Sequence, residues 1–403
     1  MASGSIEKRT AKDGTTSYRV TVELPPDSVT GERDRKRGTF RTKKEAEKAR
    51  AGWVTEVDSG IFVKNTTMTV AELCAQWLDV KRPALKPRTL VHYEYTLAAR
   101  IVPALGSVSV QRVSPVTIDA LYALLRAEGC SEDAVHRCHQ HLLQIFDYAV
   151  KRRILAANPM LAIDAPTVRT AAPTILSAPQ IQRFLTFAAT DGYNPLWLLI
   201  VQTGMRRGEA LGVRWQDVDL DTGKLRVRQC IEVLANRPHI QTPKSPAALR
   251  TITLFPESIA ALRAHRARQL QQRIAAREWQ DHDLVFATPT GGPLNPRNVL
   301  HALKNIQRVA NGQPRWNRDK PRAVSDAGTS ITVADALPDF DIHDLRHTHA
   351  THLLQAAWPI PTVSRRLGHA NPGITMTIYA HALSDTQGEA NTTPAAFAFA
   401  GTA

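Results

Sequence analysis

The spacing of apolar residues changes twice along this chain of 403 residues, and each pattern predicts a different kind of domain. Residues 1–62 carry short runs in which apolar and polar side chains alternate, as in SYRVTV at 17–22. Residues 67–166 repeat apolar side chains at helical spacing, whereas residues 174–395 mix both patterns. Strands and helices direct side chains to a core at different intervals, so we predict three domains, a number that fits this length.

The first segment is predicted to be a small α+β module of three strands followed by one helix. Its third strand is expected at Gly38–Thr42 and its helix at Lys43–Asp58. Basic residues that could contact DNA cluster around the third strand: Arg33, Arg35, Lys36, Arg37, Arg41, Lys43 and Lys44. A small sheet with basic side chains on one face can enter a DNA major groove, although a solvated charged hairpin would give the same pattern.

The second segment is predicted to be an all-α bundle. Thr69 has the character of an N-cap, with Glu72 three residues later, at the start of the first helix. Helical spacing recurs at residues 89–101, 117–128 and 132–153. No cluster of reactive side chains stands out in this segment, and a short proline-bearing linker follows it.

The third segment is predicted to be a mixed α/β domain that is mainly helical. Helices are expected at residues 177–189, 195–202, 207–211, 256–277 and 296–309. A β-rich stretch at residues 224–254 lies between them, and the polar residues 315–339 are expected to form a loop or insertion.

Charge and composition indicate the class of partner that the protein binds and the kind of compartment in which it works. The net charge is +14, which favours a polyanion such as nucleic acid over a merely basic soluble protein. The four cysteines form no CxxC pair, which is typical of reduced thiols in a cytosolic protein. The chain starts without an apolar run and has no stretch of about 18 apolar residues, so we expect neither a signal peptide nor a membrane span.

Five polar clusters in the third segment could carry chemistry. In TGMRRGEAL a glycine precedes a helix start with Arg206 and Glu209, which suits an anion but also describes a surface pair. Lys244 lies in an expected turn between strands. Gly368 in LGHANP is expected to end a helix and present His369 at a turn. Tyr379 stands alone on a short helix, where a packing role is the plain alternative.

The cluster HDLRHTHATH permits two interpretations. On a helix, His343 and Arg346 are neighbours at i,i+3, and an imidazole beside a guanidinium suits a phosphate site. His343 and His347 at i,i+4 could instead bind a metal ion. However, the glutamate of a zincin helix is missing and no third ligand is obvious.

Taken in order, the blocks TGMRRGEALGVRW, PKSPAALRTITL, HDLRHTHATHLL and LGHANPGITMTIYAH resemble the catalytic domain of tyrosine recombinases. The resemblance covers residues 175–381, about half of the chain. The stretch PALKPRTLVHYEYTLAARIVPALG resembles the core-type DNA-binding domain of that family. The strands of residues 1–62 resemble the arm-type DNA-binding module of phage and conjugative-element integrases.

The resemblance implies a role for each residue. Tyr379 would attack the scissile phosphate and form a 3′-phosphotyrosine, while Arg206 and Arg346 clamp its oxygens. The remaining roles are proton transfer to the leaving 5′-oxygen by Lys244, acceptance of the tyrosine proton by His343, phosphate binding by His369 and orientation by Glu209. Side-chain charges would replace a metal ion, and the covalent bond would remove any need for a nucleotide cofactor. In this chain SPAA follows the lysine, whereas many relatives have a Thr/Ser-rich run.

The implied function is site-specific integration or excision of a phage or mobile element in the bacterial cytoplasm. The implied partners are double-stranded attachment-site DNA and the protein itself, as a tetramer assembled on DNA. A directionality factor and a host DNA-bending protein are further candidates. The alternatives are a type IB topoisomerase-like enzyme, a chromosome-dimer-resolving recombinase, a non-catalytic DNA-binding regulator and a His-cluster metallohydrolase. The basic first segment argues against a chromosome-dimer-resolving recombinase, and the full ordered set of blocks argues against a non-catalytic regulator.

Overall fold

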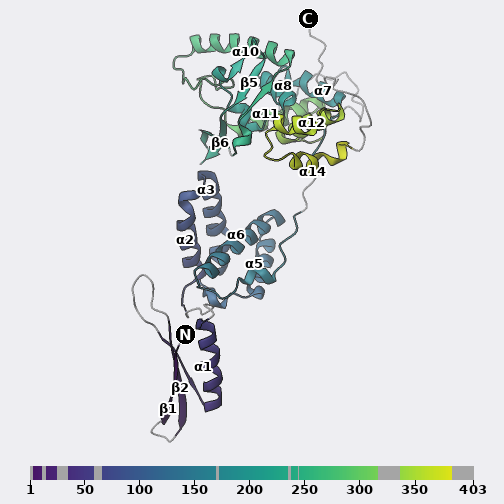
Figure 1. The fold of residues 1–403 in the computed structure, drawn as a ribbon. Coiled ribbons are helices and arrows are strands. Elements are labelled where there is room, and N and C mark those ends of the chain that lie inside the picture. Colours follow the sequence, from purple (N-terminus) through teal and green to yellow (C-terminus); the bar gives the residue numbers. More distant parts are fainter. Residues whose placement is uncertain are drawn as a thin grey trace. The chain divides into compact units, whose positions relative to one another are not determined.

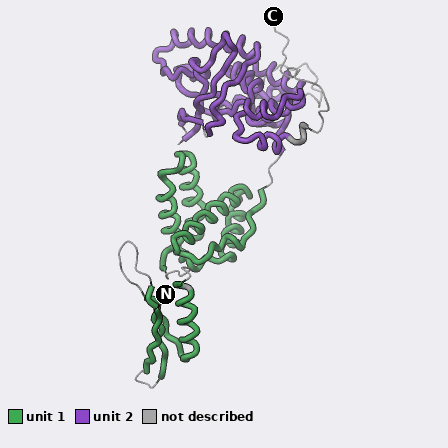
Figure 2. Tube along the Cα trace, in the orientation of Figure 1, with its two compact units in different colours: residues 1–170 green, residues 171–403 purple. Residues whose placement is uncertain are grey.

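The computed structural model divides the chain into two compact units, residues 1–170 and 171–403 (Figure 2). It describes residues 3–10, 15–24, 35–58, 66–168, 172–234, 237–243, 245–315 and 336–383. Arg33, Lys244, most of the expected loop at 315–339 and the tail after residue 383 lie outside the described residues. Among the residues that are described, no helix combines the length and the apolar character needed to cross a membrane.

The N-terminal module is an antiparallel sheet in the order β1-β2-β3 with one helix packed on it (Figure 1). The elements are β1 (Gly4–Thr10), β2 (Thr16–Glu23), β3 (Arg35–Phe40) and α1 (Lys43–Asp58). Val20 and Val22 alternate with polar residues along β2, so both point to α1 and are fully buried. The third strand begins before the expected Gly38, because Arg35 and Lys36 pair with Glu23 and Val22 on β2.

Helices form the rest of the first unit. They are α2 (Val70–Lys81), α3 (Pro87–Thr96), α4 (Val102–Leu105), α5 (Pro115–Ala127) and α6 (Glu132–Lys151). Thr69 caps α2 in the predicted way: its side chain accepts from the Glu72 N–H, and the Glu72 carboxylate accepts from the Thr69 N–H. Trp77 from α2 and Phe146 from α6 are among the buried residues of a core that shares no residue with the core of the N-terminal module.

The helix expected over residues 89–101 changes its winding before it ends. α3 stops at Thr96, and residues Leu97–Ile101 form a π-helical turn before α4. Pro103 has no N–H to donate to the preceding turn, so the regular α-helical ladder is interrupted at this point.

The second unit combines a small sheet with helices. The strands are β4 (Val218–Asp219), β5 (Lys224–Val227), β6 (Cys230–Leu234), β7 (Arg237–Gln241) and β8 (Arg250–Thr253). One antiparallel sheet has the order β4-β5-β8, and β6 and β7 form a separate hairpin. The helices are α7 (Ala178–Ala188), α8 (Asn194–Thr203), α9 (Arg207–Leu211), α10 (Pro256–Ala275), α11 (Pro296–Ala310), α12 (Ile342–Gln355), α13 (Ile360–Leu367) and α14 (Pro372–Leu383).

Contacts among these helices bring distant parts of the sequence together. α12 packs against α8 and against α14, and α13 contacts both α14 and β8. Trp197 of α8 and Phe184 of α7 are fully buried in the apolar core, and Phe340 packs on Phe184 edge to face just before α12. The expected fold class is confirmed: a small α+β module, an all-α part and a mixed, mainly helical α/β part.

Candidate active site

Arg206 is placed by the end of α8 and the start of α9. α8 ends at Gly204, which has φ +64°, a conformation that favours glycine. A Cβ there would stand 2.7 Å from the ring of His349, so the lack of a side chain also permits close packing. Glu209 then accepts from the Arg206 backbone N–H at 3.1 Å and from its Nη1 at 2.8 Å. The Arg206 side chain is thereby oriented while it stays 41% exposed.

Arg346 is buried on α12 and joins two helix ends. Its Nη1 donates to the carbonyl oxygen of Gly204 at 2.8 Å, and its Nη2 donates to that of Leu367 at 2.8 Å. Burial, and then the nearby Arg206, lowers the pKa of Arg346 to about 9, which still leaves a cation at neutral pH. A fixed, desolvated guanidinium is suited to stabilise negative charge.

His369 follows the end of α13. Gly368 has φ +71° and ends that helix, as the sequence predicts. The Nδ1 of His369 lies 2.8 Å from the hydroxyl of the buried Thr375. Burial, together with Arg346 and Arg206, lowers the pKa of His369 to about 4, so the ring is neutral at physiological pH.

Tyr379 lies on α14 at a kink, with φ −116° and ψ 18°. Its side chain is fully buried, and its hydroxyl is 2.9 Å from Nδ1 of His347. The family pattern assigns the tyrosine proton to His343, but the histidine that contacts the hydroxyl is His347. His343 lies one turn earlier on α12 and meets the ring of His347 edge to face, with 4.8 Å between centroids.

These side chains line one cleft of about 340 Å³ in the second unit. The residues on its wall are Arg206, Ser245, His343, Arg346, His347, Gly368, His369, Ala370, Ile374, Ile378 and Tyr379. Five of the six predicted catalytic residues therefore come together, from parts of the chain as far apart as α9 and α14. Lys244, the sixth, lies outside the described residues, although its neighbour Ser245 is on the wall.

Arg250 was not singled out from the sequence, yet it connects three parts of the site. Its Nη2 donates to Glu209 at 2.9 Å, its Nη1 to the Ala248 carbonyl oxygen at 3.0 Å and its Nε to the carbonyl oxygen of Arg366 at 2.6 Å. The side chain is only 4% exposed. The local sequence gives no signal for this role, because an arginine is an ordinary residue at the start of a strand.

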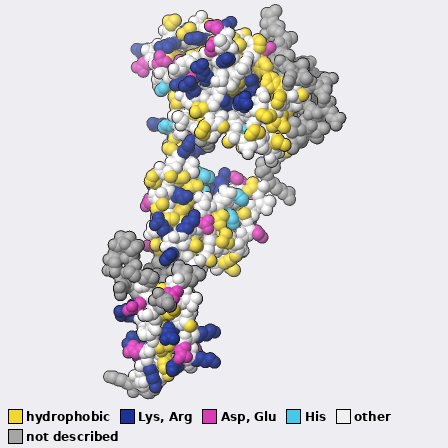
Figure 3. Space-filling model, in the orientation of Figure 1, with side chains coloured by type: hydrophobic (Ala, Val, Ile, Leu, Met, Phe, Trp, Pro, Cys, Tyr) yellow, Lys and Arg dark blue, Asp and Glu magenta, His cyan; other side chains and the backbone are white. Residues whose placement is uncertain are grey.

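The N-terminal sheet has one face away from α1, and the predicted DNA-contacting residues on β3 divide between its two faces. Lys43 and Lys44 lie instead at the start of α1, and Arg41 precedes that helix. Arg35 and Arg37 are exposed on that open face, and strand pairing adds Arg19, which the sequence analysis missed. Lys36 points to the opposite face, where its Nζ lies 4.7 Å from the ring centroid of Trp53 on α1. Figure 3 shows Lys and Arg side chains along the visible surface of this module.

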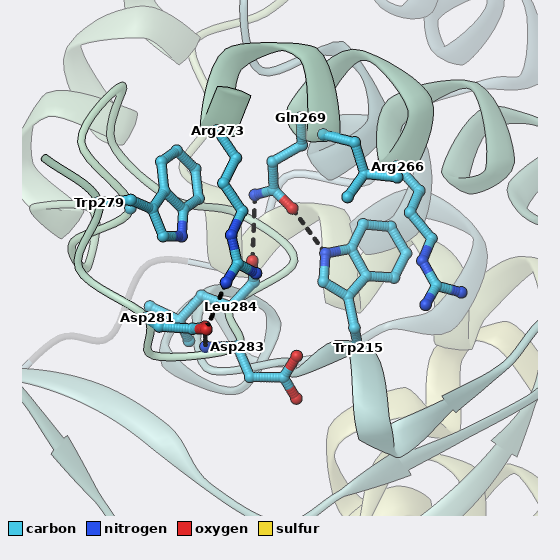
Figure 4. A pocket seen from close by; sticks show the side chains of 10 residues that line it. Trp215, Arg266, Gln269, Arg273, Trp279, Asp281, Asp283 and Leu284 are labelled. Carbon is cyan, nitrogen blue, oxygen red and sulfur yellow. Dashed lines mark hydrogen bonds and ion pairs between the residues drawn. The ribbon is translucent and has the colours of Figure 1, made fainter. Parts of the chain in front are cut away.

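A second hollow, of about 120 Å³, lies beside α10 (Figure 4). Trp215 donates from its indole Nε1 to Gln269 at 2.6 Å, and Arg273 pairs with Asp281 at 2.8 Å. Four polar side chains of its wall thus bind one another in pairs, and no tyrosine, serine, cysteine or histidine lines it. The first cleft is therefore the candidate active site.

The histidines of α12 raise the alternative of a metal site in the same region. Within the part of the chain that the structure describes, no three His, Cys, Asp or Glu side chains are grouped so that they could hold a metal ion. The rings of His343 and His347 meet edge to face, and the polar atom that Nδ1 of His347 contacts is the hydroxyl oxygen of Tyr379, at 2.9 Å.

Comparison with known proteins agrees with this geometry. Residues 174–385 match the model of the phage integrase family, and residues 70–165 match the phage integrase central domain. A tyrosine recombinase XerC-like protein of Caldanaerobacter subterraneus is 29% identical over 92% of this chain and 94% of its own length.

Two solved structures share the fold. One is the Tn1549 transposon integrase in complex with a circular intermediate DNA, with a TM-score of 0.63, 20% identity and coverage of 78% of this chain and 95% of that one. The other is a lambda integrase dimer bound to a core site, with a TM-score of 0.56, 16% identity and coverage of 96% and 97%. The family match spans more than half of the sequence. The chain therefore belongs to the phage integrase family and is a tyrosine site-specific recombinase.

Proposed function

We propose that Tyr379 is the nucleophile of this recombinase and that it cleaves one DNA strand as a 3′-phosphotyrosine with release of a 5′-hydroxyl. The observation that carries the proposal is the position of its hydroxyl in one cleft with Arg206, Arg346 and His369. Two guanidiniums and a neutral imidazole there offer donors to the oxygens of a phosphodiester, so negative charge in the transition state is balanced by side chains.

The other residues take supporting roles. Arg206 and Arg346 bind the non-bridging oxygens, and His369, held by Thr375, donates a hydrogen bond from its second ring nitrogen. Glu209 orients Arg206. The family pattern gives Lys244 the role of protonating the leaving 5′-oxygen, and Ser245, the next residue in the sequence, lies on the cleft wall.

The substrate is double-stranded DNA at the attachment sites of a phage or mobile element in the bacterial cytoplasm. The net charge of +14 and the basic open face of the N-terminal sheet support binding to DNA. Exchange of four strands requires four active sites, so the protein would act as a tetramer on DNA. A directionality factor and a host DNA-bending protein remain candidate accessory partners.

The test traps the covalent intermediate. The full chain is incubated with a pool of nicked suicide duplexes, and DNA that stays attached to denatured protein is sequenced. Tyr379→Phe should lose the adduct and keep DNA binding, whereas Tyr193→Phe, which alters a half-buried tyrosine of the core outside the cleft, should keep both. An adduct that persists in Tyr379→Phe would overturn the proposal.

A further inference from the structure

The side chain of His347 connects α12, which carries Arg346, with α14, which carries Tyr379. It lies on α12, next to Arg346, and its ring reaches the hydroxyl of Tyr379 on α14. We propose that His347 is a catalytic residue that holds the Tyr379 hydroxyl and takes its proton when the strand is cleaved. This inference rests on the proposed role of Tyr379 as the nucleophile.

Geometry separates His347 from its neighbour His343. The distance from His347 Nδ1 to the tyrosine oxygen is 2.9 Å, within reach for direct proton transfer. His343 is the more exposed of the two, and its ring packs edge-on against the ring of His347. Such a contact limits rotation of the His347 ring and so helps to keep Nδ1 directed at the hydroxyl.

The direction of the hydrogen bond follows from the ionisation of its partners. Burial raises the pKa of Tyr379 to about 12, although Arg346 and Arg206 act in the opposite direction, so the hydroxyl keeps its proton at neutral pH. Burial, and then His343, lowers the pKa of His347 to about 4, so its ring is neutral. The hydroxyl therefore donates and Nδ1 accepts, which places the ring proton of His347 on Nε2.

In the proposed cleavage step one bond to phosphorus forms as another breaks, and each proton has a donor and an acceptor. The tyrosine oxygen forms a bond to phosphorus as its proton passes to Nδ1 of His347, and the bond from phosphorus to the 5′-oxygen breaks. The 5′-oxygen takes a proton from the acid that the family pattern identifies as Lys244. Rejoining runs the same transfers backwards: the imidazolium of His347 returns its proton to the tyrosine oxygen, so neither group needs an external reagent.

The surrounding charges tie this transfer to the presence of substrate. Without DNA, burial, then His343 and to a smaller extent Arg346, lower the pKa of His347 and so disfavour an imidazolium there. A phosphodiester bound by Arg206 and Arg346 brings a negative charge into the cleft and offsets these cations. The histidine therefore becomes a better base when the phosphate is in place, which protects the nucleophile from ionising in the free protein.

The test uses His347→Asn in the full chain, because asparagine can still accept a hydrogen bond but cannot carry the proton. Single-turnover cleavage of a suicide duplex should slow by about 10²-fold or more, with DNA binding retained. Replacing Tyr379 by 3,5-difluorotyrosine, whose phenol ionises more readily, should then restore at least about tenfold of the lost rate.

A matched comparison separates the base from the acid. A substrate with a 5′-bridging sulfur has a leaving group that needs no proton, so it should rescue Lys244→Ala and not His347→Asn. Difluorotyrosine at position 379 should instead rescue His347→Asn and not Lys244→Ala. Wild-type rates in His347→Asn, or rescue of that variant by the sulfur substrate and not by difluorotyrosine, would overturn the inference. Persistence of the adduct in Tyr379→Phe would instead remove the proposed function itself.

Discussion

Arg250 donates from Nη2 to Oε2 of Glu209 at 2.9 Å, and both side chains are only 4% exposed. The other carboxylate oxygen of Glu209 accepts from Arg206. Burial raises the pKa of Glu209, but the charges and hydrogen bonds of Arg250 and then Arg206 outweigh it and hold that pKa below its ordinary value. An ionised Glu209 thus links Arg206, which we propose binds the phosphate, to β8, the strand that follows Lys244 in the sequence.

Removing one partner of this buried pair should be costly. Arg250→Ala leaves the Glu209 carboxylate without its most buried cation, and such losses typically destabilise a protein by about 3–5 kcal/mol. Denaturant-dependent hydrogen exchange in α9 and β8 measures the effect within the full chain. The control is Arg263→Ala, which breaks an exposed pair with Asp221 and should cost no more than about 1 kcal/mol. Equal losses in the two variants would contradict the expected role of Arg250.

The pair of Arg250 and Glu209 should also make the free energy of unfolding depend on pH. The folded-state pKa of Glu209 lies below its ordinary value of 4.5, so its contribution is complete above pH 4.5 and is lost as pH falls through the folded value. Glu209→Gln should be less stable than the wild type at pH 7, and the difference should shrink as the solution is acidified. Urea midpoints of both proteins across this range provide the measurement. A difference that stays constant down to about pH 3 would show that the carboxylate is not the cause.

Local chemistry explains which parts of this structure could be read from the sequence. The capping box of Thr69 and Glu72 and the helix end at Gly368 depend on residues within one turn, and both were predicted. Arg206, Arg346 and Tyr379 were singled out through the resemblance to a family, because each one alone has an ordinary alternative role.

Partners that are distant in the chain explain what was missed. Arg250 meets Glu209 across 41 positions and Arg366 across 116, and nothing near Arg250 in the sequence indicates either contact. The contact of His347 with Tyr379 spans 32 positions and depends on how α12 packs against α14. Periodicity identifies the two helices, but it does not give the rotation that selects His347 over His343.

Strand cleavage should continue in excess EDTA. Arg206 and Arg346 line the cleft, and the pKa of about 9 for Arg346 keeps it charged at neutral pH, so the cations proposed to balance the phosphate are covalently part of the protein. The yield of the covalent adduct is compared with and without chelator, and again after Mg²⁺ or Zn²⁺ is added back. If EDTA stops cleavage and Zn²⁺ restores it, the pair His343 and His347 belongs to a metal site and the proposed chemistry is wrong.

Arg37 and Lys36 are neighbours on β3, but they should affect DNA binding differently because they lie on opposite faces of the sheet. Arg37 is exposed on the open face, whereas Lys36 lies over Trp53 beneath α1. If the open face binds the DNA backbone, Arg37→Ala removes one phosphate contact, and the slope of log Kd against log salt should fall by about 0.9. Lys36→Ala should keep the slope and lose about 0.5–1 kcal/mol of stability. Fluorescence anisotropy on attachment-site DNA over a range of salt concentrations measures both slopes. Identical slopes for Arg37→Ala and the wild type would mean that the open face does not bind the DNA backbone.

A fragment that starts near Thr67 tests the whole N-terminal module, because it shows the DNA binding that remains without it. Footprints of the fragment and of the full chain on attachment-site DNA are compared. Identical footprints would mean that the N-terminal sheet does not read a separate DNA site.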